Sequence, residues 1–88
     1  MDIEAMTAEV GEWLGQYVPG ATPLQVAAKV CEEAGELIAC EINDGRSIRS
    51  NRRTEVADVL IAVLAYMATV GINPAEAYVA KMRELWER

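Results

Sequence analysis

Four carboxylates stand in two pairs of matching spacing, Glu33 with Glu36 and Glu55 with Asp58. Residues three apart on a helix share a face, so each pair would point in one direction. If the two helices faced each other, the four negative charges would converge and would have to take up protons unless something compensated them. A divalent cation is the natural compensation. The spacing therefore predicts a metal site formed by these four residues.

Asp58 carries the strongest physical signal of the four. It lies near the start of residues 56–70, which are otherwise uncharged and nearly all apolar. A helix that is apolar on all sides is expected to be buried, and a buried carboxylate must be paired, protonated or bound to a metal. A salt bridge to Arg52 or Arg53 is the alternative to a metal. Asp58 alone leaves both interpretations open.

The neighbours of the first pair add to the prediction. An isolated run of glutamates such as Glu32, Glu33 and Glu36 is a weak signal, because a solvated helix face often carries one. Lys29, however, lies four residues before Glu33, so the same face offers an amine that can bind phosphate. Gly35 leaves bare space beside the carboxylates. Together these residues favour the metal site over the solvated face.

Composition narrows the class of protein. The net charge of −6 argues against nucleic-acid binding, which requires an excess of Lys and Arg. The absence of histidine removes a common ligand of zinc and iron, so any metal should be hard and oxygen-bound. The hydrophobic share of 52% exceeds what one small core can hide, which predicts a homo-oligomer.

The location of the protein is predicted from its first residues and its longest apolar run. Asp2 and Glu4 stand where a signal peptide would carry basic residues, and no apolar run reaches the ~20 residues of a membrane span. We expect a cytoplasmic protein without a membrane partner. Cys31 and Cys40 lie nine apart in one predicted helix, on opposite faces, so no disulfide is expected between them.

Helix start and stop signals divide the chain into four helices within one domain, residues 1–88. Thr22, Pro23 and Gln25 form the pattern of a capping box with a first-turn proline, and Gly71 suits a left-handed C-cap. The predicted helices cover residues 3–17, 23–42, about 50–70 and 74–87. Short connections favour an all-α fold in which the second and third helices form an antiparallel pair. We expect such chains to assemble into an oligomeric helical bundle.

These residues match a known family. The matching stretches are KVCEEAGEL at residues 29–37 and EVADVL at residues 55–60, followed by an apolar helix, residues 71–74 and a last helix containing Lys81. They span roughly two-thirds of the chain. The sequence resembles the MazG-like, all-α nucleoside triphosphate pyrophosphohydrolases.

The resemblance implies hydrolysis of (deoxy)nucleoside triphosphates to the monophosphate and pyrophosphate, in a nucleotide-pool housekeeping role. It also implies a homodimer or homotetramer with sites at subunit boundaries. The metal would be Mg²⁺, with Mn²⁺ possible, held by Glu33, Glu36, Glu55 and Asp58. Glu32 or a member of that set would accept a proton from water. The candidate catalytic residues are therefore Glu32, Glu33, Glu36, Glu55 and Asp58.

The resemblance also suggests substrate-binding residues. Lys29, Lys81 and an arginine of residues 46–53, for which we select Arg53, are candidates to bind phosphate oxygens. The last helix departs from the family in lacking an asparagine soon after Lys81. Tyr17 and Trp13 are candidates to stack on the base, as an aromatic of the first helix does in the similar dCTP-cleaving relatives.

The preference for a base stays open. A tryptophan at helical spacing most often belongs to a core, and this is the interpretation we favour for Trp13. The sequence has Ala62 where those relatives often have a tyrosine.

Other classes of protein remain as alternatives. Phosphoribosyl-ATP pyrophosphohydrolase shares a similar glutamate-rich stretch but usually has Tyr-His shortly after its aspartate, where this chain has Ile61 and Ala62. A non-catalytic module that dimerises through its apolar third helix is a second alternative. A di-iron bundle is strongly disfavoured, because its Glu-x-x-His ligands require histidine.

Overall fold

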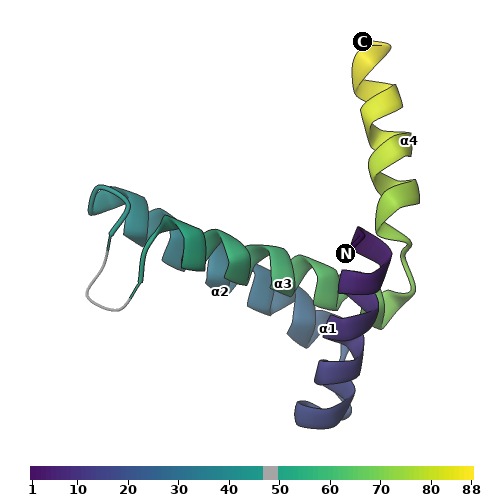
Figure 1. The fold of residues 1–88 in the computed structure, drawn as a ribbon, viewed down its shortest axis with the longest axis horizontal. Helices are drawn as coiled ribbons and strands as arrows, with labels where there is room; N and C mark the ends of the chain where they lie inside the picture. The colour runs from purple at the N-terminus through teal and green to yellow at the C-terminus, as the bar shows by residue number, and fades with distance from the viewer. Residues whose placement is uncertain (47–49) are drawn as a thin grey trace.

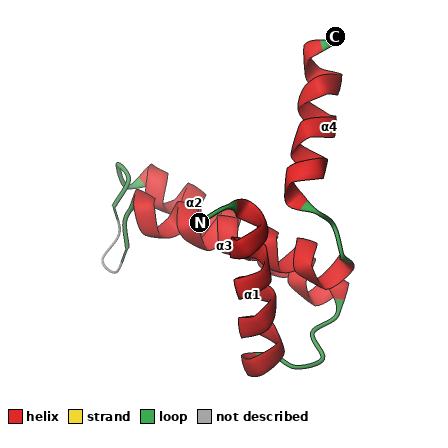
Figure 2. Ribbon diagram, turned by 45° about the vertical axis from the view of Figure 1, so that its right-hand side comes forward, coloured by secondary structure: helices red, strands yellow, loops and turns green. Residues whose placement is uncertain are grey.

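The computed structural model describes residues 1–46 and 50–88. The described chain forms the helices α1 (Ile3–Tyr17), α2 (Pro23–Ile42), α3 (Arg52–Val70) and α4 (Pro74–Trp86). Within these described residues there is no strand, only an isolated bridge between Arg46 and Asn51. Figure 2 shows the helices and their short connections. The all-α prediction and the four predicted helices are confirmed.

Local capping sets the helix boundaries where the sequence predicted them. The Thr22 hydroxyl accepts a hydrogen bond from the backbone N–H of Gln25, and Gln25 Oε1 accepts one from the backbone N–H of Thr22. Asn51 and Asn73 cap α3 and α4 by accepting from the amide three residues later. Gly71 ends α3 with a φ of 76°, in the left-handed region.

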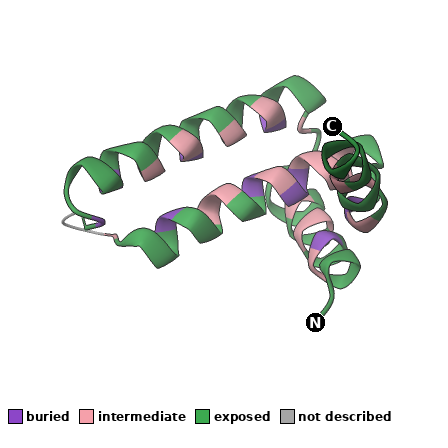
Figure 3. Ribbon diagram, turned by 90° about the horizontal axis from the view of Figure 1, so that it is seen from above, coloured by how far each residue is buried: buried purple, intermediate pink, exposed green. Residues whose placement is uncertain are grey.

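The second and third helices form the predicted antiparallel pair, and α1 crosses α3 (Figure 1). The helices α1 and α3 approach closely at Gly11, where an added Cβ would lie 3.1 Å from the Ala68 Cβ. Most of the buried residues of α2 and α3 lie along the faces that the two helices turn toward each other (Figure 3). The buried residues are Val26, Glu33, Cys40, Glu55, Ala62, Leu64 and Ala65, of which Leu64, nine residues after Glu55, lies on the opposite face of α3.

The apolar third helix is not buried on all sides in a single chain, contrary to the expectation from its sequence. Val56 is 54% exposed and Ile61 is 49% exposed. The reason is geometric, since α1 and α2 cover only part of its circumference and α4 turns away at 106° to α3 (Figure 1).

The chain as a whole exposes an unusual amount of surface. Its accessible surface is 6627 Å², whereas a compact monomer of 9.6 kDa exposes about 5,100 Å². Its radius of gyration is 14.5 Å, against about 12 Å for a compact chain of this length. A second body of similar apolar character would cover the excess.

Two further predictions concern single helices. Within the described residues, no one helix is both long and apolar enough to cross a bilayer; only α3 and α4 together reach that length and composition, as a pair bent by 106°. Cys31 is exposed, Cys40 is buried, and both are free, as predicted.

Candidate active site

The seam between α2 and α3 brings the predicted carboxylates together. Glu33, Glu55 and Asp58 each place a carboxylate oxygen within 4.8 Å of the others. Glu32, Glu33 and Glu36 form a second group within the same distance. Because Glu33 belongs to both groups, all five side chains form one carboxylate cluster across the two helices.

Two oxygens of the carboxylate cluster lack the partner that burial demands. Glu33 and Glu55 are each only 8% exposed. Glu33 Oε2 and Glu55 Oε2 are buried, and among the described residues neither has a hydrogen-bond partner. An unsatisfied buried polar atom costs about 1–3 kcal/mol, and more when it is charged. A divalent cation fits these oxygens, since carboxylates are the ligands that Mg²⁺ and Mn²⁺ prefer.

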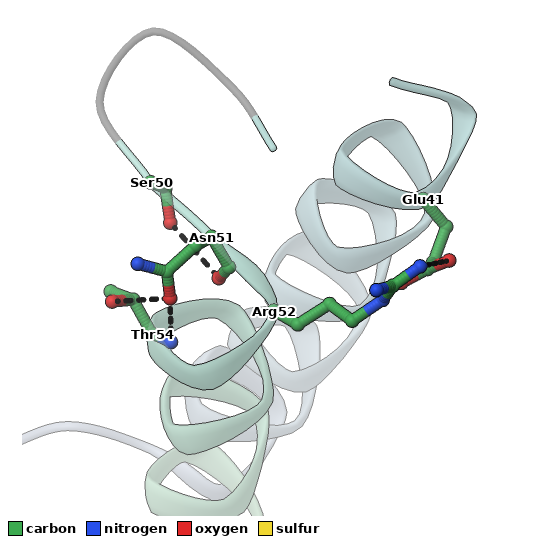
Figure 4. Close-up of polar contacts among 5 residues, drawn as sticks. All are labelled: Glu41, Ser50, Asn51, Arg52 and Thr54. Carbon is green, nitrogen blue, oxygen red and sulfur yellow. Dashed lines mark hydrogen bonds and ion pairs between the residues drawn. The ribbon is translucent and has the colours of Figure 1, made fainter. Parts of the chain in front are cut away.

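Among the described residues, no arginine forms an ion pair with Asp58. Arg52 donates from its guanidinium to both carboxylate oxygens of Glu41, near the loop end of the α2–α3 pair (Figure 4). Within the described part of the chain, no ion pair joins Asp58 to Arg52 or Arg53. The salt-bridge alternative for Asp58 therefore finds no support in the geometry.

The shifted pKa of Glu36 in the carboxylate cluster is in the direction expected when negative charges lie close together. A hydrogen bond with Glu33, and the negative charge of Glu33, raise the pKa of Glu36 above its usual range. Lys29 Nζ lies 3.1 Å from Glu33 Oε1 and 3.4 Å from Glu32 Oε1. These hydrogen bonds to Glu33 and Glu32 raise the pKa of Lys29, which stays protonated. Lys29 neutralises one charge of the group and leaves the others.

An apolar cleft of about 520 Å³ adjoins the cluster on the side toward the start of α2. Among the residues that line the apolar cleft are Trp13, Gln25, Val26, Lys29, Ala62 and Ala65. Lys29 belongs to the wall of the cleft and also contacts the carboxylate cluster. The cleft and the cluster are therefore two parts of one continuous site.

Of the two aromatic residues of α1, Trp13 lines this cleft, and both are exposed. Trp13 is 54% exposed, so our interpretation of Trp13 as a core residue is wrong. The physical reason is that α1 meets α3 on its Gly11 side, which leaves Trp13 at the edge of the contact. The Trp13 and Tyr17 rings lie 5.2 Å apart and are tilted by 36°.

Two predicted phosphate-binding residues lie elsewhere in the single chain. Lys81 Nζ contacts Glu84 at 3.1 Å on α4, which packs mainly against α1. Arg53 lines a separate cleft, of about 530 Å³, with Arg46 near the loop end of the hairpin. Arg49, also within the predicted arginine segment, lies outside the described residues.

Sequence reasoning missed several residues that line the site, among them Gln25 and Val26. Gln25 was assigned only a capping role and Val26 no role. A signal was nevertheless present, because Gln25 lies four residues before Lys29 and eight before Glu33, on the same helix face.

The fold and site define an all-α protein with a carboxylate cluster that fits divalent metal ions. No protein-family model matches the chain. The chain is 35% identical over 80 residues to the dATP/dGTP diphosphohydrolase of cyanophage S-2L, covering 91% of this chain and 70% of that protein.

A solved structure agrees with this match. It is the cyanophage S-2L MazG-like pyrophosphohydrolase bound to dGDP and three catalytic Mn²⁺ ions per active site. It superposes with a TM-score of 0.82 at 34% identity, covering 100% of this chain and 81% of its own. The chain belongs to the MazG-like pyrophosphohydrolases. The expected family and the enzyme class, nucleoside triphosphate pyrophosphohydrolase, are confirmed.

Proposed function

We propose that this enzyme hydrolyses purine deoxynucleoside triphosphates to the monophosphate and pyrophosphate with the help of bound divalent cations. The observation that carries the proposal is the pair of unpartnered buried oxygens, Glu33 Oε2 and Glu55 Oε2, at the centre of the carboxylate cluster. The similar cyanophage structure, with three Mn²⁺ ions in its site, supports it.

The carboxylates and Lys29 would have different roles in the reaction. Glu33, Glu36, Glu55 and Asp58 would hold Mg²⁺ or Mn²⁺. When bound, such ions neutralise phosphate charge and acidify a coordinated water. Lys29, at the boundary of cluster and cleft, is placed to bind a phosphate oxygen. Glu32 is exposed and leans toward Lys29, so it is accessible to take up the proton of the attacking water.

The apolar cleft would hold the base. Its volume of about 520 Å³ falls within the 300–1,000 Å³ range of small-molecule sites. Ala62 and Ala65 are small residues in its wall, which leaves room for a purine. Trp13, half-exposed at the cleft, offers a ring face for stacking, and Tyr17 supports that ring. The cyanophage relative is named for dATP and dGTP, both purine nucleotides.

The working form would be a homodimer or homotetramer. The excess surface of the single chain is roughly 1,500 Å², about twice the 800 Å² that each partner buries in a standard interface. Exposed Tyr78, Val79 and Trp86 on α4 supply apolar contact area. Lys81 would reach a carboxylate cluster only in such an assembly. Light scattering on wild type and on Val79→Glu measures how many chains assemble. A monomeric wild type would contradict the proposed oligomer.

A triphosphate panel tests the proposal. Pyrophosphate and monophosphate release is measured for the four deoxynucleoside triphosphates, the ribonucleotides and phosphoribosyl-ATP, with Mg²⁺, with Mn²⁺ and with EDTA. We expect metal-dependent turnover that is fastest for purine deoxynucleotides. Turnover only of phosphoribosyl-ATP would favour that alternative, and absence of both turnover and metal binding would favour a non-catalytic module. A role in nucleotide-pool housekeeping in the cytoplasm fits the proposed reaction.

A further inference from the structure

A helix cap orients the side-chain amide of Gln25 at the wall of the apolar cleft. Its Oε1 accepts the backbone N–H of Thr22 at 2.9 Å, and its own backbone N–H donates to the Thr22 hydroxyl at 3.2 Å. Because the Thr22 N–H can only donate, the atom that faces it must be the amide oxygen. The capping box therefore determines which end of the Gln25 amide is engaged.

The other end of this amide is available to a ligand. Among the described residues, Gln25 Nε2 has no hydrogen-bond partner, although the side chain lines the cleft. With one lone pair of its oxygen used by the helix cap, Gln25 keeps both N–H groups of its amide for a ligand and so presents mainly donors at the cleft. A glutamine fixed in this way can distinguish between ligands, whereas one free to rotate can satisfy either kind of group.

The position of Gln25 along α2 corresponds to the base end of a nucleotide. Gln25, Lys29 and Glu33 follow one another at spacings of four on one helix face, so Gln25 is about 12 Å along the axis from Glu33. If the triphosphate binds near Lys29 and the carboxylate cluster, the base extends toward Gln25. The apolar wall of Val26, Ala62 and Ala65 lies at the same end.

Purine bases differ in the groups that they present to such a donor. The N7 and O6 edge of guanine carries two acceptors, whereas the same edge of adenine carries the N7 acceptor and the N6 amino donor. A glutamine that presents its amide NH₂ satisfies the guanine edge and opposes the adenine amino group. We propose that Gln25 is a specificity-determining residue whose amide NH₂ favours guanine over adenine in the apolar cleft. This inference rests on the proposed function.

The substitution Gln25→Glu isolates the donor. Glutamate at the third helical position also completes a capping box, so the helix cap is retained while the NH₂ donor becomes an acceptor. We expect wild type to prefer dGTP to dATP in kcat/KM with Mn²⁺. In the variant, the dGTP/dATP ratio should fall by about tenfold or more, because the guanine edge then faces an acceptor. Using a ratio cancels any general repulsion between the new charge and the triphosphate.

Controls separate the donor from charge and from other base groups. Gln16→Glu adds the same charge at an exposed position of α1 and should leave the ratio unchanged. Inosine triphosphate in its deoxy form, which keeps O6 and N7 but lacks the 2-amino group, should behave as dGTP does. If it behaved as dATP does, the 2-amino group would be the recognised feature and the inference would be wrong.

The outcomes also distinguish this inference from the function on which it rests. Normal wild-type turnover with a ratio that Gln25→Glu leaves unchanged would overturn the role of Gln25 and leave the proposed function intact. Absence of wild-type turnover on every triphosphate would overturn both. A ratio that falls in Gln25→Glu, with an unchanged Tm, would support both.

Discussion

The α2–α3 seam has an acidic part, the carboxylate cluster, and a cleft part, the wall of the apolar cleft. The two parts have similar structure and differ in chemistry. At the acidic part, Glu33 and Glu55 are each 8% exposed; at the cleft part, Val26, Ala62 and Ala65 are each 5% exposed. Both parts lie on the same pair of helices, and their degree of burial is similar. At the cleft part burial itself is favourable, whereas at the acidic part it is tolerable only if a cation compensates. The difference is what we expect if the acidic part binds the proposed metal ions and the cleft part packs in the ordinary way.

The largest effect is expected from Asp58→Asn, which removes one charge from the acidic part and keeps the shape of the side chain. Turnover should fall by at least about a hundredfold, since changes to groups that only orient metal ligands already cost ten- to hundredfold. Without metal, the variant should melt no lower than wild type, because repulsion with Glu33 and Glu55 is reduced.

Pyrophosphate release and thermal melting in EDTA measure these two effects. The matched control is Glu4→Gln, which removes a charge from the exposed first turn of α1. Full turnover by Asp58→Asn would refute the proposed metal site, while the same loss in both variants would indicate a nonspecific effect of charge.

Removing the metal should lower the melting temperature through the acidic part of the seam and leave the cleft part unaffected. At a hundred times its dissociation constant, a bound ion stabilises the folded state by about 2.7 kcal/mol. For a domain of this size that corresponds to a rise in Tm of about 10–20 °C on adding Mn²⁺. Differential scanning calorimetry with Mn²⁺ and with EDTA measures it. The rise should be largely lost in Asp58→Asn. A wild type whose Tm does not change with Mn²⁺ would contradict the proposed metal site.

Ala62→Leu should affect the cleft part alone. The added atoms occupy the cleft beside Val26 and Ala65, so kcat/KM for purine deoxynucleotides should fall roughly tenfold. The Mn²⁺-induced rise in Tm should persist, because the carboxylate cluster is unchanged. Ala8→Leu at an exposed position of α1 is the control. Loss of the Mn²⁺ response in Ala62→Leu would mean that the two parts of the seam are not separable.

The sequence was sufficient for the features that local rules decide. Thr22, Asn73 and Gly71 end or begin helices through contacts within a few residues, so the boundaries could be predicted. The convergence of Glu33 with Asp58 was also accessible, because each pair has helical spacing and a short connection makes the two helices antiparallel.

Features that depend on distant contacts were not accessible in this way. The exposure of Trp13 follows from how α1 crosses α3, and the direction of α4 follows from the turn after Gly71. The donor character of Gln25 required knowing that its capping box lies at the wall of a cleft. Helical periodicity shows which face of a helix is apolar but not which helix covers it.

The smallest effect is expected outside both parts of the seam, at the pair formed by Glu41 and Arg52 (Figure 4). The hydrogen bond from Arg52 lowers the pKa of Glu41 below its ordinary value of 4.5. A carboxyl whose pKa is lowered by folding contributes stability that is present above its ordinary pKa and is lost as pH falls through the lowered one. Since both side chains are exposed, the contribution is small.

Glu41→Gln should therefore lower the Tm slightly at pH 7, and the difference from wild type should disappear in acid, once Glu41 is protonated in wild type as well. High salt should reduce the same difference at pH 7, because solvent ions screen exposed charges. Melting curves of both proteins from pH 7 down into acid, together with turnover at pH 7, test the contribution of the Glu41–Arg52 pair. We expect unchanged turnover, since Glu41 belongs to neither the carboxylate cluster nor the cleft. A large loss of turnover in Glu41→Gln would mean that the loop end of the hairpin takes part in the site, as a third part beside the carboxylate cluster and the cleft.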